Sequence, residues 1–191
     1  MNKTVSSGNT SACRTAKVRC RIAVTVLLAT IAVACSQAPS PATEVLDYAD
    51  MVLLDAENLS EGGIGTAYRQ KILPLLKRHV PAPAEVAEKL DADAPSYTVA
   101  ALGRTYAIYA PQMDVSAGQN WGNATFALFD IVNRQMAGSA HRFYAVNAGN
   151  DLGGLFLTEE TYRHAVSSIG SHRDRPYLPT RDPPWYGQPH D

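Results

Sequence analysis

Apolar positions recur with helical spacing in one part of the chain and fall into short β-rich runs in others. The clearest helical pattern covers residues 121–136, where Phe126, Phe129 and Val132 share one side. Those side chains would be solvated unless that side packs on a core. We therefore expect a helix here that contributes its apolar side to the core.

Two pairs of β-rich runs predict two hairpins. Residues 97–101 and 104–109 flank a turn that contains glycine, which is typical of a hairpin. Residues 142–146 and 155–157 form a second pair, separated by residues 147–154. Three Gly, two Asn and one Asp lie in that interval, so we expect a longer Gly-rich loop there.

The remaining segments give shorter signals. Residues 51–54 and 85–94 are each compatible with a short strand or a helix turn. Residues 68–76 have helical spacing with Pro74 inside, which predicts a kink or an early stop. A last helix is expected over residues 158–168, because threonine can cap it and two acids occupy its first turn.

This order of elements predicts an α+β fold in a single domain over residues 44–170. The economical arrangement is a small antiparallel sheet with about three helices packed on it. Residues 171–191 are rich in proline and contain tyrosine and tryptophan, so we separate them as a Pro-rich aromatic tail.

Composition and charge narrow the class of protein. Of 191 residues, 46% are hydrophobic and 18% are charged, which is a globular composition. Five of the 17 basic residues precede residue 35, so the rest of the chain has 12 bases against 18 acids. An acidic balance is unsuited to contacting phosphates, and we expect no nucleic-acid partner.

The first 34 residues have the pattern of a signal peptide. Basic residues precede the apolar run 22–34, whose 13 residues would make about 20 Å of helix. The hydrocarbon core of a membrane is about 30 Å thick, so this run is too short for a transmembrane helix. We expect the segment to be removed during export.

The end of that run, Ile31-Ala32-Val33-Ala34-Cys35, resembles the lipobox of bacterial lipoproteins, with Ala32 where the family usually has Leu. The resemblance implies cleavage before Cys35, which then carries diacylglycerol and usually a third, palmitate-type acyl chain. Residues 35–43 would be the acylated Cys and a flexible tether. Ser36 favours the outer membrane in the enterobacterial pattern, so we expect a lipid-anchored envelope protein facing the periplasm. The alternative is an ordinary signal peptide.

Known catalytic and metal-binding spacings were not found in the sequence. There is no GxSxG elbow and no HExxH pair, and Gly62–Gly65 lacks the spacing of a phosphate loop. Cys13 and Cys20 lie in the removed segment, so the mature domain would have neither a thiol site nor a disulfide. We predict no catalytic residues, no metal and no cofactor.

Five residues are candidates for contacting a partner. Asn147, Asn150 and Asp151 belong to the expected Gly-rich loop, where amides and a carboxylate can face one concavity. Trp185 and Tyr186 lie in the tail, and aromatic residues are common at interface hot spots. The simpler alternatives are that the loop only turns the chain and that the tail straps the protein's own sheet.

The segments WGNATFALFDIVNRQ, RFYAVNAGNDLGGLFLT and YLPTRDPPWYGQ resemble small immunity proteins encoded beside antibacterial toxins, over roughly residues 50 to 190. The resemblance implies a periplasm-facing inhibitor that binds a toxin or effector and occludes its active site. Two alternatives remain open. One is a structural or assembly lipoprotein of the envelope, and the other is an envelope hydrolase built on Asp151 and His164.

Overall fold

The strands form two separate three-stranded sheets, both antiparallel, in a computed structural model that describes residues 45–113, 116–149 and 151–190. The α+β fold expected from the sequence is confirmed. The division of the strands between two sheets is a feature that the sequence pattern did not indicate. In sheet order the strands are β1 (Val52–Leu54), β6 (Asp151–Thr158) and β5 (His141–Ala148) in one, and β2 (Ala87–Asp91), β3 (Ser96–Ala101) and β4 (Arg104–Tyr109) in the other.

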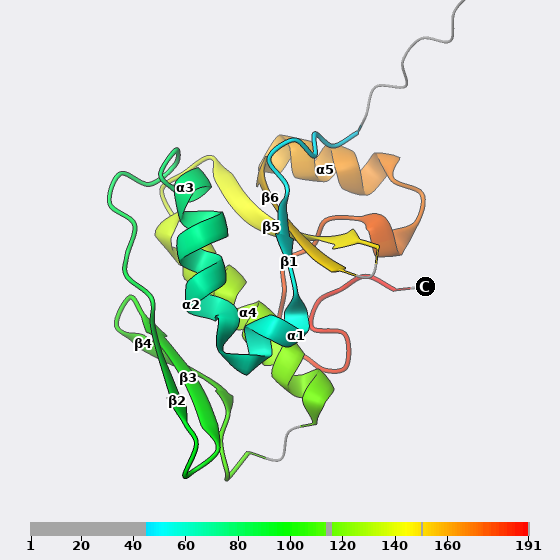
Figure 1. The fold of residues 1–191 in the computed structure, drawn as a ribbon. Coiled ribbons are helices and arrows are strands. Elements are labelled where there is room, and N and C mark those ends of the chain that lie inside the picture. Colours follow the sequence, from blue (N-terminus) through cyan, green and yellow to red (C-terminus); the bar gives the residue numbers. More distant parts are fainter. Residues whose placement is uncertain (1–44, 114–115, 150, 191) are drawn as a thin grey trace, which may run out of the picture. The chain divides into compact units, whose positions relative to one another are not determined.

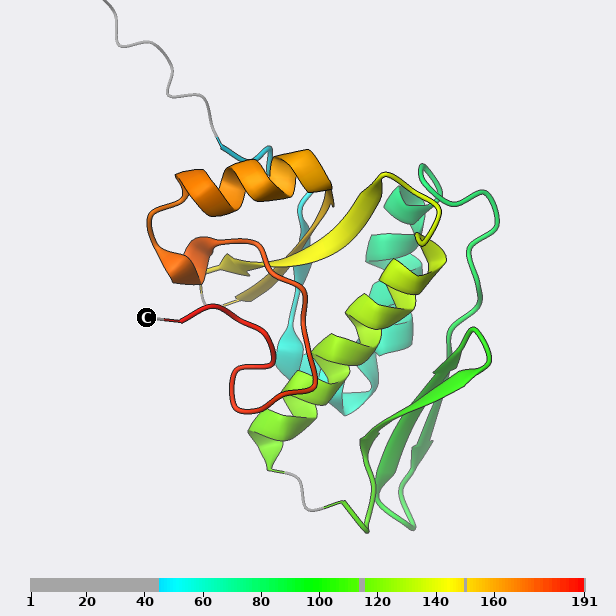
Figure 2. The ribbon, with the colours of Figure 1, turned by 180° about the vertical axis from the view of Figure 1, so that it is seen from behind.

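Helices lie between the two sheets (Figures 1 and 2). The longest, α4 (Ala117–Gln135), begins one turn before the expected 121–136 helix and ends one residue before it, with Met136 as its C-cap. Its first turn is closed by a capping box, in which Ser116 and Gln119 bond each other's backbone. Phe129 and Val132 are buried as predicted, and Phe126 is half-buried.

A second helical stretch runs from Ala56 to Leu76 but is not a regular helix. Gly62 has a φ of 106°, which L-residues rarely adopt and which bends the chain. A further wide turn directly precedes Pro74, whose ring cannot follow a regular helical turn. The pieces are α1 (Ala56–Asn58), η1 (Leu59–Gly63), α2 (Ile64–Ala67), η2 (Tyr68–Ile72) and α3 (Leu73–Leu76).

The β1–β6–β5 sheet is covered on both faces. Along β5, Phe143 and Ala145 belong to the core shared with α4, while Tyr144 and Val146 belong to a second core. That second core includes Ala165 of α5 (Glu159–Ser168), so α5 packs on the outer face. Both residues 51–54 and residues 85–94, ambiguous in the sequence, contribute strands.

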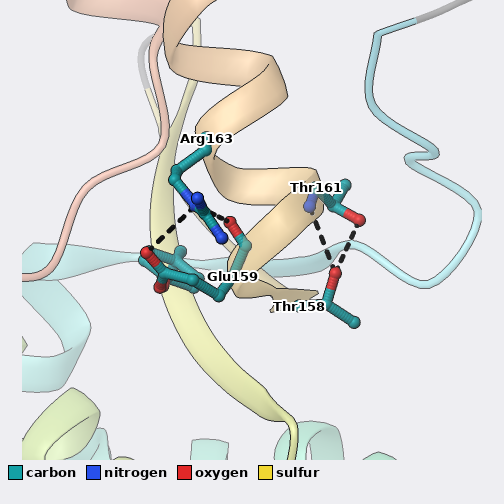
Figure 3. A network of polar contacts seen from close by, with 5 residues as sticks. Thr158, Glu159, Thr161 and Arg163 are labelled. Carbon is teal, nitrogen blue, oxygen red and sulfur yellow. Dashed lines mark hydrogen bonds and ion pairs between the residues drawn. The ribbon is translucent and has the colours of Figure 1, made fainter.

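The start of α5 explains its pair of acids (Figure 3). The Thr158 hydroxyl accepts a hydrogen bond from the Thr161 N–H at 3.1 Å, as a helix cap does. One turn on, Glu159 and Arg163 form an i,i+4 ion pair at 3.5 Å. The acids of this first turn are accounted for by helix stability, as the sequence suggested.

The prediction of a Gly-rich loop over residues 147–154 is wrong. The ladder of β5 and β6 continues to the pair Ala148–Asp151, so strand pairing occupies positions that the prediction gave to the loop. Glycine was a misleading loop signal because Gly154 lies inside β6. A Cβ at this position would overlap the Phe143 ring, so the glycine makes room for an aromatic side chain within the strand.

The tail packs on its own domain. Tyr177 exchanges two backbone hydrogen bonds with Ala145, at 2.8 and 2.9 Å, which adds a bridge beside β5. Further along, the Tyr186 ring lies so close to Gly122 of α4 that a Cβ there would overlap it. Arg181 lies over the Phe126 ring at 4.8 Å. A short η3 turn (His172–Asp174) precedes these contacts.

Candidate functional site: the tryptophan cleft

An open cleft of about 270 Å³ lies where the tail meets α4 and the β5–β6 turn. We call it the tryptophan cleft. Three segments far apart in the sequence build it, together with Ala56. The lining residues are Gly118, Trp121, Gly122 and Thr125 from α4; Val146, Asn147, Gly149, Asp151 and Leu152 from the hairpin; and Arg173, Tyr177, Pro184, Trp185, Tyr186 and Gln188 from the tail.

Both tryptophans of the chain line this cleft, and both are exposed. Trp121 is 42% exposed on the first half of α4, and Trp185 is 50% exposed on the tail. The Trp185 ring stacks on His190, with centroids 4.5 Å apart. Two large aromatic surfaces are therefore presented to solvent at one place on the domain.

Two tyrosines support the tail wall of the cleft. Burial raises the pKa of the Tyr177 hydroxyl to about 12, so this side chain stays neutral over the physiological range. Burial also raises the pKa of Tyr186, whose ring rests on Gly122. Tyr177 is paired with Ala145 of β5 and the Tyr186 ring lies against α4, so the tail is held on both sides of the cleft.

Polar groups complete the lining. The Asn147 side-chain amide donates to the Asp174 carboxylate at 3.0 Å, which ties the end of β5 to the η3 turn. Asp151 at the start of β6 is exposed, and Arg173 and Gln188 come from the tail. The cleft thus offers indole and phenol rings together with carboxylate, amide and guanidinium groups.

The structure brings together four of the five partner-contact candidates from the sequence. Asn147, Asp151, Trp185 and Tyr186 all line the tryptophan cleft. The fifth, Asn150, lies outside the described residues, and so does the lipidation candidate Cys35. The two expected origins of the site, hairpin and tail, therefore meet at one place.

The sequence analysis missed Trp121, Arg173 and Gln188. Trp121 was counted only as the start of a helix pattern, although its position lies outside the apolar side of that helix. Because Trp121 lies off the apolar side of the helix, the sequence pattern could have predicted an exposed aromatic side chain at the start of this helix. Arg173 and Gln188 carried no signal, because their place depends on how the tail folds back.

A second cavity of about 320 Å³ contains a histidine pair. The rings of His79 and His141 lie 4.4 Å apart, and His79 also stacks on Phe156 at 5.1 Å. Burial, followed by the charges of His141 and Arg78, lowers the pKa of His79. Arg78 in turn pairs with Asp50 at 2.5 Å. Within residues 45–113, 116–149 and 151–190 there is no group of three potential metal ligands.

The residues of the hydrolase alternative do not line one cavity. Asp151 lines the tryptophan cleft, whereas His164 is exposed on α5 and lies 3.5 Å from the Ser168 hydroxyl. Among the described residues, the Asp151 carboxylate and the His164 ring form neither a hydrogen bond nor an ion pair with each other.

Comparison with known proteins gives no relative. No protein-family model matches the chain, and neither a curated protein nor a solved structure matches it. No helix in the described part of the chain is both long enough and apolar enough to span a bilayer.

Proposed function

We propose that this chain is a lipid-anchored binding protein of the bacterial envelope that holds a protein partner at the tryptophan cleft. The observation that supports this most is the convergence of two exposed tryptophans on one cleft. Large aromatic residues dominate the binding energy of protein interfaces, and here they are not required for the domain's core. A partner that covers them removes apolar surface from water.

The partner is a toxin or effector that the chain neutralises. This part of the proposal rests on the resemblance of three segments to immunity proteins and on the acidic balance after residue 34. An acidic surface speeds the capture of a basic enzyme by electrostatic steering. An inhibitor needs no catalytic group of its own, and its action depends on how long the complex lasts.

The anchor rests on the lipobox-like sequence that ends at Cys35. Two or more acyl chains hold a protein stably on a membrane. Replacing Cys35→Ser is expected to abolish palmitate labelling and to move the chain out of the membrane fraction. Unchanged labelling of the variant would contradict the lipoprotein assignment.

The binding function is tested with the product of the neighbouring gene, if that gene encodes a secreted toxin. The full chain, purified in neutral detergent, is expected to bind this product and to restore growth of cells that export it. Trp121→Ala and Trp185→Ala are each expected to raise koff with the fold unchanged. Because their surfaces are exposed, truncation should weaken binding at least tenfold if they are anchors.

Leu90→Ala is the matched control, since Leu90 is a large apolar residue that is 52% exposed on the other sheet. Its koff is expected to equal that of the parent chain. Binding that is indifferent to both tryptophan variants would contradict the assignment of the cleft. A chain that binds only resident envelope proteins would instead be a structural or assembly lipoprotein.

A further inference from the structure

We infer that a cavity beside α5 binds the headgroup phosphate of a membrane phospholipid. We call it the α5 cavity, and its volume is about 540 Å³, within the range of ligand pockets, about 300–1,000 Å³. Residues of β5, α5 and the tail line it, among them Arg142, Tyr144, Glu159, Tyr162, Arg175 and Leu178. The inference rests on the proposed lipid anchor and adds a second contact between the domain and the membrane.

The charged residues of the lining favour an anion. Arg142, His172 and Arg175 are its basic residues, and Glu159 is the single acid among the described residues that line it. The Glu159 carboxylate is already paired with Arg163 at 3.5 Å. The local balance is therefore positive, although the chain beyond residue 34 is acidic overall, and an anion is attracted to it.

Both arginines of the lining have donors available for a phosphate. In the part of the chain that the structure describes, no hydrogen bond or ion pair involves the Arg142 guanidinium. Arg175 is half-buried and donates through Nε to the Ile169 carbonyl oxygen at 2.9 Å, which holds the guanidinium and leaves its two amino groups for a ligand. A guanidinium can donate two parallel hydrogen bonds to one phosphate, which makes arginine well suited to this group.

The apolar part of the lining favours a lipid over a free phosphate ion. Leu178 of the tail is 37% exposed, and Val166 of α5 and Pro189 line the same cavity. The stacked rings of Tyr144 and Tyr162, with centroids 4.4 Å apart, add aromatic surface. Inorganic phosphate gains nothing from these groups, whereas the first methylenes of a phospholipid are removed from water against them.

The described chain begins on this side of the domain. Leu46 and Tyr144 belong to the same core, Val45 and Tyr162 pack against it, and both views show this start beside α5 (Figures 1 and 2). Val45 lies ten positions after Cys35. Ten residues span at most about 35 Å, so an acyl group on Cys35 keeps this side of the domain within reach of the membrane surface.

The experiment measures binding by isothermal titration calorimetry on the full chain in neutral detergent, with detergent alone as the blank. The probes are dihexanoyl phosphatidylglycerol, dihexanoylglycerol, which lacks the phosphate, and inorganic phosphate, all at one ionic strength. The phospholipid is expected to bind about tenfold more tightly than either of the other probes. It alone uses both the arginines and the apolar lining.

The signs of the variant effects identify the ligand as an anion. Arg142→Gln should weaken phospholipid binding about tenfold, because it removes a charged hydrogen-bond donor from an exposed position that the fold does not need. Glu159→Gln should strengthen binding, because it removes the acid of the lining. Arg104→Gln is the matched control, since it removes an equal charge from an exposed position on β4 outside the cavity. Its affinity should equal that of the parent chain.

Equal affinity for the phospholipid and for dihexanoylglycerol would overturn the inference, and so would weaker phospholipid binding by Glu159→Gln. Inorganic phosphate that binds as tightly as the phospholipid would overturn the lipid and make this a site for the free ion. Failure of the α5 cavity is distinguishable from failure of the anchor. Palmitate-labelled Cys35 without phospholipid binding removes only the cavity, and phospholipid binding without labelling removes only the anchor.

Discussion

The two sheets are alike in strand number and differ in what surrounds them. Four consecutive residues of β5, Phe143 to Val146, are buried, because helices cover both faces of the β1–β6–β5 sheet. In β3, burial alternates, and only Tyr97, Val99 and Ala101 face the core. One sheet is an inner layer and the other is an outer cover.

This difference indicates why the cleft belongs to the inner sheet. The end of β5 and the start of β6 are held by ladder pairs, by the core on one face and by α5 on the other. Residues at such an end keep a fixed position, which a binding site requires. The β2–β3–β4 sheet has only one packed face and contributes no residue to the lining of the cleft.

The largest effect is expected from breaking the contact between α4 and the inner sheet. Phe129 is 1% exposed and stacks on Phe143 with centroids 4.6 Å apart. Phe129→Ala should lower the free energy of unfolding by about 3–5 kcal/mol, measured by denaturant titration. Phe126→Ala is the control, because truncating this half-buried residue of the same helix should lower the free energy of unfolding less than Phe129→Ala does. Equal losses would show that the helix face is wrongly assigned.

A smaller effect is expected at the outer sheet. The buried Tyr97 hydroxyl bonds the Glu88 carboxylate and accepts from the Ile64 N–H at 3.3 Å. Tyr97→Phe leaves that N–H and the carboxylate without this partner, so it should cost about 1–3 kcal/mol. Among the described residues no hydrogen bond involves the Tyr109 hydroxyl, which makes Tyr109→Phe the control. A silent Tyr97→Phe would show that this sheet is held by apolar packing alone.

The next effect concerns the tail rather than either sheet. Gly122→Ala places a Cβ in the space of the Tyr186 ring, and such overpacking costs about 1–3 kcal/mol. Alanine also favours the helix by up to about 1 kcal/mol, so the net change in stability should be small. The tail should detach, which faster trypsin cleavage after Arg181 would reveal. Gly118→Ala is the control, because a Cβ added at Gly118 would lie 4.0 Å from its nearest neighbour. Equal cleavage in both variants would contradict the docking of Tyr186.

The smallest effect is a pH dependence at the histidine pair. Because the pKa of His79 is lowered in the folded chain, the unfolded chain binds that proton first on acidification. Stability should therefore be full above about pH 6.5, the ordinary value for histidine, and should fall as the pH drops below it. His79→Phe keeps an aromatic ring against Phe156 and should lose this part of the pH dependence. An unchanged slope in melting temperature between pH 7 and 5 would contradict the assignment.

Local signals in the sequence were sufficient for the fold class and for most elements. The α4 helix, the hairpin of β3 and β4, and the cap at Thr158 each depend on nearby residues, and all are present. The second hairpin was shortened in the prediction because glycine was taken as a loop signal. Only the tertiary contact of Gly154 with Phe143 explains glycine inside β6.

The candidate site shows the same limit. The residue types of Asn147, Asp151, Trp185 and Tyr186 suggested a partner before any geometry was known, and all four line the cleft. The hairpin and the tail meet at the cleft because the bridge between Tyr177 and Ala145 joins residues that are 32 positions apart in the sequence. Such a pairing leaves no periodicity in the sequence, so the shared cleft was not predictable.

The assembly of the cleft from three distant segments has a consequence for how such a protein can diversify. The tail is attached to the domain by the backbone hydrogen bonds of Tyr177 and by the contact of the Tyr186 ring with Gly122. Trp185, in contrast, is exposed to solvent. Substitutions at Trp185, Gln188 or Arg173 change the chemistry of the lining of the cleft, and none of these residues belongs to the core that holds β5 and α4. Under the proposed function, a lineage that meets changing partners can therefore alter its specificity by single substitutions at the cleft that leave the core residues unchanged.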